Sequence, residues 1–126
     1  MLDVEVIGTA AIAPVEVERL ASLAAASAGI EDGHVAVEFV DGDRIRDLNR
    51  QWRGKDTPTD VLSFPIDEDP HEPVHGEREL GDVVISPEHT VDLREAVVHG
   101  VLHLTGMDHE TDDGEMLALQ KEILSW

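Results

Sequence analysis

The feature that most constrains the fold is the run AVVHGVLHLTG, which ends at Gly106 and is apolar except for two histidines and a threonine. Asp92 and Glu95 precede it with the spacing of a capping box, so the pattern predicts a helix that begins after Asp92 and ends at Gly106. His99 and His103, four residues apart, would project from the same side of this helix. Buried imidazoles are costly without partners, which favours a shared metal ion over two isolated polar groups.

A third histidine, His109, follows three residues after Gly106. A glycine here can adopt the left-handed conformation that ends a helix, which lets the chain return towards the helical pair. Three histidine nitrogens around zinc, with one coordination position left open, form the pattern of catalytic zinc sites. We therefore predict one Zn²⁺ per chain, with His99, His103 and His109 as ligands.

The spacing of these histidines matches the HExxHxxGxxH pattern of zinc peptidases, except that Gly100 stands where the peptidases have their general base. A peptidase would therefore need another base, and Asp108 and Glu110, which flank His109, are the candidates. Because glycine lacks a side chain, we also expect Gly100 to leave room for a bulkier substrate group beside the metal.

The rest of the chain alternates between strand and helix patterns. Strands are expected at 2–7, 34–40, 61–66 and 81–86, and helices at 14–29, 43–53, 93–106 and 116–126. A turn is expected at Asp41 and Gly42, and polar loops at 67–79 and 108–115. Residues 1–126 are thus expected to form a single domain of the α+β class, in which a four-stranded mixed β-sheet packs with helices, one of them a zinc-hydrolase-like histidine helix.

Composition excludes several other chemistries. The chain has no cysteine, so disulfides, a cysteine nucleophile and thiolate metal ligands are impossible, and a transition-metal site must use histidine and carboxylates. The acidic start of the chain is unlike a secretory leader, and no apolar run has the length of a membrane span. We expect a cytoplasmic protein that does not contact membranes.

The formal charge of −19 argues against nucleic acid as a partner, because such a surface repels a polyanion. Residues 44–55 are the exception, since they contain five of the nine basic residues and one acid, Asp47. We call these five residues the basic strip: Arg44, Arg46, Arg50, Arg53 and Lys55. Charges act over about 8 Å at physiological salt, so the strip can attract RNA locally even though weak binding is expected overall. On the other face of this helix, Ile45, Leu48 and Trp52 are expected to pack together.

Three segments together resemble a known family. HGVLHLTGMDHE is similar to the HGxLHLxGxDH signature of the bacterial YbeY proteins, the single-strand-specific endoribonucleases of ribosomal RNA maturation. WRGKDTPTDVLSFP at 52–65 and LGDVVISPE at 80–88 are similar to two further blocks of that family, in the same order. The likeness covers most of residues 40–125.

The resemblance implies a zinc-dependent endoribonuclease with His99, His103 and His109 as metal ligands and with His99 and Arg53 in catalysis. Its partners would be single-stranded RNA, in particular ribosomal RNA, and the ribosome or its proteins, with no DNA expected. Arg53 also has a chemical reason for this role, because a guanidinium matches phosphate oxygens and stabilises charge that develops on phosphorus. Without the resemblance, Arg53 could equally be an exposed arginine at a helix end.

Two alternatives remain open at this stage: a metallopeptidase, and a non-catalytic ribosome assembly factor with a structural zinc. The chain departs from the family in one place, since only HTVDLREA separates ISPE from VVHG, where YbeY proteins have a longer segment. This shorter segment could change access to the metal. The remaining histidines are expected to be exposed: His34, His71, His75 and His89.

Overall fold

The structure is a computed structural model, which describes residues 2–66, 79–106 and 114–126. Four strands and four α-helices follow one another in these ranges, with one short 3-10 helix. The elements are β1 (Leu2–Ile7), α1 (Pro14–Ser27), β2 (Gly33–Phe39), α2 (Gly42–Arg53), β3 (Val61–Pro65), β4 (Glu79–Ile85), η1 (Pro87–His89), α3 (Leu93–Leu104) and α4 (Glu115–Leu124). All eight expected strands and helices are therefore present, with bounds shifted by one or two residues.

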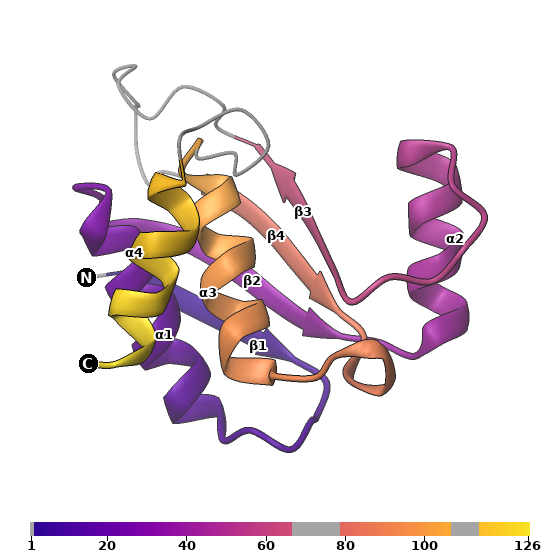
Figure 1. Cartoon of the computed structure of the whole chain (residues 1–126), viewed down its shortest axis with the longest axis horizontal. Coiled ribbons are helices and arrows are strands. Elements are labelled where there is room, and N and C mark those ends of the chain that lie inside the picture. Colours follow the sequence, from indigo (N-terminus) through magenta and orange to yellow (C-terminus); the bar gives the residue numbers. More distant parts are fainter. Residues whose placement is uncertain (1, 67–78, 107–113) are drawn as a thin grey trace.

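The strands form one sheet in the order β1-β2-β4-β3. β1 pairs with β2 and β2 with β4 in parallel, whereas β3 pairs with β4 in antiparallel orientation at the sheet edge. This is the mixed four-stranded sheet of an α+β protein, as predicted. Figure 1 shows the sheet with α1 and α3 across one face.

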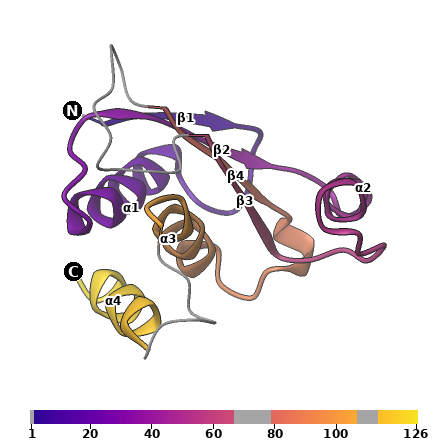
Figure 2. The same cartoon turned by 90° about the horizontal axis from the view of Figure 1, so that it is seen from above.

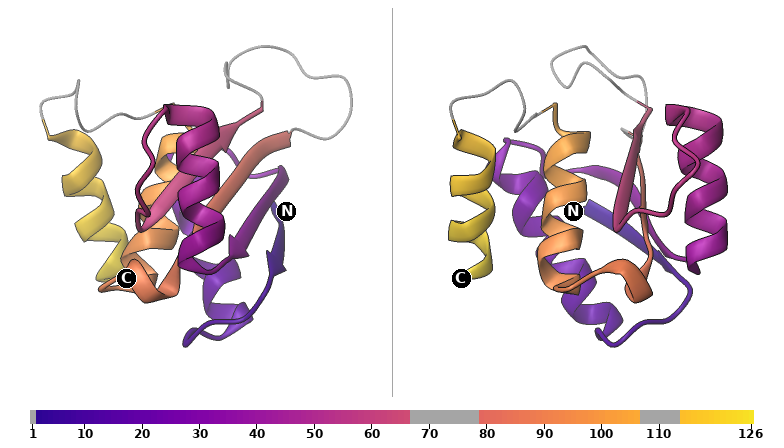
Figure 3. Two further views of the ribbon diagram at one scale, coloured as in Figure 1. Left: turned by 90° about the vertical axis from the view of Figure 1, so that its right-hand side faces the viewer. Right: turned by 45° about the vertical axis from the view of Figure 1, so that its right-hand side comes forward.

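The helices lie in layers on both sides of the sheet. α1 packs on β1 and α3 packs on β3 and β4, while α4 packs on α1 and α3. Seen from above, α4 lies beyond α1 and α3, farther from the sheet (Figure 2). The right-hand view of Figure 3 places α2 on the opposite side of the sheet from α3.

Two apolar clusters hold these layers together. The larger one lies between the sheet and the helices α1, α3 and α4, because alternate residues of the strands point to that side. Its centre includes Val35, Val37, Val83, Ile85, Val97, Val101 and Leu102. The smaller cluster attaches α2 to β3 and β4 through Ile45, Leu62 and Val84, with Leu48 and Phe64 at its edge.

The histidine helix has the ends that the sequence predicts. The Asp92 carboxylate accepts hydrogen bonds from the backbone N–H groups of Arg94 and Glu95, at 3.0 and 3.2 Å. After the helix, Gly106 has a φ of 99°, a conformation that favours glycine. The prediction of a helix that begins after Asp92 and stops at Gly106 is therefore confirmed.

Several local expectations were wrong. Asp41 does not end β2 in a turn but caps α2, since its carboxylate accepts from the Arg44 N–H at 2.8 Å. Trp52 does not share the buried face with Ile45; it is 68% exposed in the last turn of α2 and meets Phe64, at the edge of the small cluster. The apolar run VLSFPI predicts a short buried strand, but β3 is an edge strand in which only Leu62 is buried.

His34 was expected to be merely exposed, but its side chain is only 23% exposed. It lies between Glu5 and Glu79, with ring nitrogen to carboxylate distances of 3.3 and 2.7 Å. The hydrogen bond to Glu79 raises the pKa of His34 above its ordinary value. This histidine therefore links β1, β2 and β4 on the sheet face that α1 and α3 leave uncovered.

Among the helices of the described ranges, none has the length and apolarity needed to cross a bilayer.

Candidate active site

His99 and His103 face each other from one side of α3. Their Nε2 atoms are 3.2 Å apart, and their ring centroids are 4.7 Å apart. Two nitrogens that share one zinc at about 2.0–2.1 Å each can be no more than about 4.2 Å apart. The observed separation therefore fits a common metal ion, and the spacing of four residues produces the arrangement that the helix geometry requires.

Gln120 of α4 orients the first of these histidines. Its side chain is buried, and its Oε1 lies 2.9 Å from His99 Nδ1. Because an amide oxygen can only accept, the ring proton is at Nδ1 and the lone pair of Nε2 is directed towards His103. In the sequence, Gln120 groups with Leu117, Ile123 and Leu124 on one side of the last helix, and this pattern predicts no role at the metal site. A single amide on an otherwise apolar helix face was the available signal.

The other predicted ligand and its neighbours lie outside the described residues. This applies to His109, to Asp108 and Glu110 beside it, and to two further histidines, His71 and His75. Within residues 2–66, 79–106 and 114–126, no set of three or more His, Cys, Asp or Glu side chains is arranged to hold a metal ion. In that part of the chain, the candidate centre consists of the pair His99 and His103.

His99 and His103 line a groove of about 720 Å³. Loop 59–60 and the edge strand β3 line this groove, and α2 contributes its last two residues, Trp52 and Arg53. Gly54 ends α2 in a left-handed conformation, with a φ of 70°, so Arg53 is presented at the helix terminus. The structure thus brings Arg53 to the same groove as His99 and His103.

Asp60 is the one carboxylate among the described residues that line this groove. Its Oδ1 accepts hydrogen bonds from the Val61 N–H at 2.8 Å and from the Thr59 hydroxyl at 3.2 Å. These bonds hold the carboxylate at the start of β3. Asp60 could not be identified from the sequence, because it is one of 28 acidic residues and no motif distinguishes it.

Gly100 has a different role from the one expected. A Cβ at this position would lie 2.4 Å from Val83 Cγ1 and 3.3 Å from Val61 Cγ2, so the glycine faces the sheet and not the groove. It lets α3 approach β4 closely and opens no space for substrate. The Ser63 hydroxyl donates to the Gly100 carbonyl at 3.0 Å, which ties β3 to the same turn of α3.

The basic strip is partly neutralised in the folded chain. Arg46 pairs with Asp56 at 2.9 Å, and Arg50 pairs with Asp47 at 3.2 Å. The hydrogen bond between Arg46 and Asp56 lowers the pKa of the aspartate and raises that of the arginine. Asp56 lies one position after residues 44–55, so the charge of that segment alone does not include it. With these two pairs formed, Arg44, Arg53 and Lys55 are the residues of the basic strip that have no acidic partner in the described part of the chain.

A smaller hollow of about 250 Å³ adjoins the groove. It shares Asp60, Val61 and His99 with the groove and is otherwise lined by His89 of η1, by residues 90–92 and by Glu95 and Ala96 of α3. The His89 side chain is 40% exposed, as expected for a loop histidine. The short segment HTVDLREA (89–96), in which the chain departs from the YbeY pattern, therefore lies next to His99.

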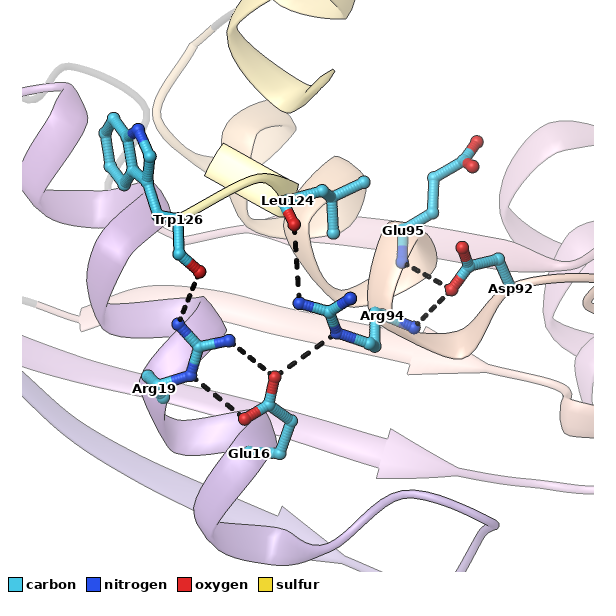
Figure 4. A network of polar contacts seen from close by, with 7 residues as sticks. All are labelled: Glu16, Arg19, Asp92, Arg94, Glu95, Leu124 and Trp126. Atoms are coloured by element: carbon cyan, nitrogen blue, oxygen red, sulfur yellow. Dashed lines mark hydrogen bonds and ion pairs between the residues drawn. The ribbon is translucent and has the colours of Figure 1, made fainter. Parts of the chain in front are cut away.

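Polar contacts at the opposite end of α3 fix the helices that carry this site (Figure 4). Glu16 of α1 accepts hydrogen bonds from Arg19 at 2.6 and 2.9 Å and from Arg94 of α3 at 3.2 Å. Both arginines also reach backbone carbonyls at the end of the chain, those of Trp126 and Leu124, each at 3.5 Å. The network joins α1, α3 and α4, and so keeps Gln120 beside His99.

Comparisons with known proteins show the family of this chain. Residues 10–126 match the family model described as Endoribonuclease YbeY. The endoribonuclease YbeY of Persephonella marina is 46% identical, over 75% of this chain and 70% of that protein, and that of Geobacillus kaustophilus is 44% identical, over 86% and 83%. The solution structure of TM1509 from Thermotoga maritima matches 99% of this chain and 87% of its own, with a TM-score of 0.57 and 30% identity. The chain therefore belongs to the YbeY family of endoribonucleases.

Proposed function

We propose that this chain, acting as one metallohydrolase domain over residues 1–126, is a zinc-dependent endoribonuclease that cuts single-stranded ribosomal RNA during ribosome maturation. The observation that carries the proposal is the pair of Nε2 atoms 3.2 Å apart in a groove that also contains Arg53. His99 and His103 would hold the metal together with His109. When bound, zinc supplies a Lewis acid that polarises a phosphoryl oxygen or acidifies the attacking hydroxyl group.

The side chains of the groove would perform the remaining work. Arg53 offers a planar fork of donors at the end of α2, which suits the non-bridging oxygens of a phosphodiester and stabilises negative charge as it develops there. Two hydrogen bonds hold the Asp60 carboxylate just before the first residue of β3. It can accept a proton from a hydroxyl group that enters the groove. Gln120 keeps the His99 ring in the tautomer that leaves Nε2 for the metal.

Charge explains why we propose the ribosome as the setting, with a cytoplasmic location. The chain carries −19 overall, whereas only three groups of the basic strip have no acidic partner in the described residues, and one of these, Arg53, lines the groove. Such a surface repels long RNA at a distance and attracts it only within about 8 Å of the strip. An RNA strand presented by a ribosome or a ribosomal protein would avoid this long-range repulsion.

The proposal is tested by measuring zinc content and cleavage of a single-stranded RNA for the wild type and three variants. His103→Ala should lose zinc and cleavage together. Arg53→Ala should keep zinc and lose cleavage by about 10²–10³-fold, the usual cost of removing one group that stabilises charge in a transition state. Lys121→Ala, at an exposed position of α4 outside both the groove and the basic strip, is the control and should retain both. Full activity of Arg53→Ala would exclude its proposed role.

The strong negative charge favours one second candidate, an assembly factor that contains zinc but does not cut RNA. In that case zinc would be structural, and a chelator would unfold the chain. For a catalytic zinc, a chelator should abolish cleavage at concentrations that leave the circular dichroism spectrum unchanged. A peptidase is disfavoured, because Gly100 faces Val83 and Val61 and leaves no space for a glutamate.

A further inference from the structure

We propose that Trp52, supported by Phe64, is a platform on which one unpaired base of the RNA strand stacks while the adjacent phosphate lies at Arg53. This inference rests on the proposed function and adds to it the contact that selects single strands. It starts from two facts that the catalytic groups do not explain: the exposure of Trp52 and its position in the groove.

Trp52 is unusual in this chain. Only four residues are Trp, Phe or Tyr, and two of them, Trp52 and Phe64, meet at this groove. Single exposed apolar residues are common on protein surfaces and need no function. Trp52 differs from such residues because it lines the groove that contains His99 and His103, next in sequence to the arginine proposed to bind phosphate.

The indole is held in place on one side. Its centroid lies 5.8 Å from that of Phe64, with the rings inclined by 64°, which is a favourable edge-to-face pair. Phe64 in turn packs on the cluster of Ile45, Leu62 and Val84, so it is anchored to the sheet. A single ring contact can cover at most one face of an indole. With the side chain 68% exposed, Trp52 can therefore receive a flat ligand.

Base stacking suits this arrangement better than other contacts. Every base has a π-face, so stacking on tryptophan works for any sequence, and aromatic platforms of this kind recur in proteins that bind single strands. A base inside a duplex is already stacked on both faces and cannot use the platform. Because the indole is uncharged, its contribution to binding also escapes the repulsion caused by the net charge of −19.

The first test locates the base by fluorescence. The chain has two tryptophans, so Trp126→Phe leaves Trp52 as the only reporter, and Arg19 contacts the backbone carbonyl of Trp126, which this change retains. We expect a short single-stranded RNA, added to the chelator-treated protein so that no cleavage occurs, to quench the Trp52 emission. The same RNA annealed to its complement should not quench it. Quenching by the duplex to the same extent would overturn the proposal.

The second test measures the energetic contribution of the ring. By anisotropy of a labelled oligonucleotide, Trp52→Ala should raise Kd by about tenfold or more, Trp52→Phe should raise it less, and Trp126→Ala should leave it unchanged. The loss caused by Trp52→Ala should persist at high salt, because stacking is not screened. An oligonucleotide with abasic positions should bind wild type and Trp52→Ala alike.

The outcomes separate this inference from the proposed function. If the wild type cuts single-stranded RNA and Trp52→Ala binds and cuts it equally well, the platform is wrong and the nuclease stands. If the wild type neither binds nor cuts RNA, both are wrong. Quenching of Trp52 by an unstructured peptide but not by the oligonucleotide would also overturn the platform, since the groove would then bind protein.

Discussion

At the scale of single residues, the site depends on a side chain that makes no contact with substrate in our proposal. Gln120 reaches from α4 to His99 Nδ1 and thereby determines which ring nitrogen faces His103. Groups in this outer position commonly matter for metal affinity almost as much as the ligands themselves. A buried amide on the last helix thus becomes part of the metal site.

We predict that Gln120→Leu, which has a similar size but no acceptor, weakens zinc binding by about 10–100-fold, the usual range for the loss of such a partner. Gln120→Glu retains an oxygen acceptor and should bind zinc more tightly than the leucine variant. Competition with a chromophoric chelator measures both affinities. Gln51→Leu, at an exposed position of α2, is the control. Equal zinc affinity for the wild type and Gln120→Leu would show that the hydrogen bond has no such role.

Gly100 supports the site in another way, by allowing α3 to approach the sheet. Gly100→Ala should destabilise the chain by about 1–3 kcal/mol, because the new methyl group would meet Val83 at 2.4 Å. In the double variant Gly100→Ala with Val83→Ala, the clash is removed, so its loss of stability should be smaller than the sum of the two single losses. Urea unfolding measures all three, and strictly additive losses would contradict this account.

At the scale of elements, α4 is the part of the fold that connects stability with the site. It packs on α1 and α3 without forming part of the layer next to the sheet, and the contacts around Glu16 join all three helices. The two hydrogen bonds from Arg19, and then the one from Arg94, lower the pKa of Glu16 below its ordinary value. The packing of α4, which carries Gln120, on α1 and α3 is therefore linked to the ionised carboxylate of Glu16.

This link predicts a pH dependence with a definite sign. A carboxylate whose pKa is lowered in the folded chain stabilises it fully above the ordinary pKa, about 4.3 for glutamate, and loses this effect as the pH falls through the lowered value. Glu16→Gln should therefore unfold at a lower urea concentration than the wild type at pH 7, and the difference should shrink as the pH approaches 3. Glu18→Gln, a neighbouring exposed acid, should show no such difference. A gap that is constant with pH would refute the assignment.

At the scale of the whole molecule, electrostatics limits how the chain can approach RNA. Two of the five arginines and lysines in the basic strip are paired with aspartates, which leaves Arg44, Arg53 and Lys55. The outer face of the sheet adds acids such as Glu5 and Glu79 around His34. The molecule thus offers a small positive area on a strongly negative body.

Salt dependence measures the size of that area. The logarithm of the binding constant for single strands falls with the logarithm of salt concentration by about 0.7 for each phosphate neutralised. Three unpaired cations therefore predict a slope no steeper than about −2 for the chelator-treated protein, whereas five would give about −3.5. Titrations of an oligonucleotide at several salt concentrations give the slope directly. A slope near −3.5 would mean that Arg46 and Arg50 leave their aspartates to bind RNA.

The amino-acid sequence by itself determined the parts of this protein that depend on near neighbours in the chain. Strand alternation, the cap at Asp92 and the stop at Gly106 specified the elements, and a spacing of four residues placed His99 and His103 on one side of a helix. These features follow from backbone geometry, which repeats over a few residues. The class of the fold and the histidine pair could be predicted for that reason.

Only the tertiary structure decided which distant residues meet. The contact of Gln120 with His99, the position of Gly100 against Val83 and the exposure of Trp52 beside the groove each depend on how helices dock on the sheet. A local pattern carries no information on such contacts, because Gln120 is 21 positions from His99, Gly100 is 17 from Val83 and Trp52 is 47 from His99. The pattern also does not distinguish one amide, glycine or aromatic residue from another of its kind. Docking is set by the packing of the whole apolar core, and with it the surroundings of the histidine pair.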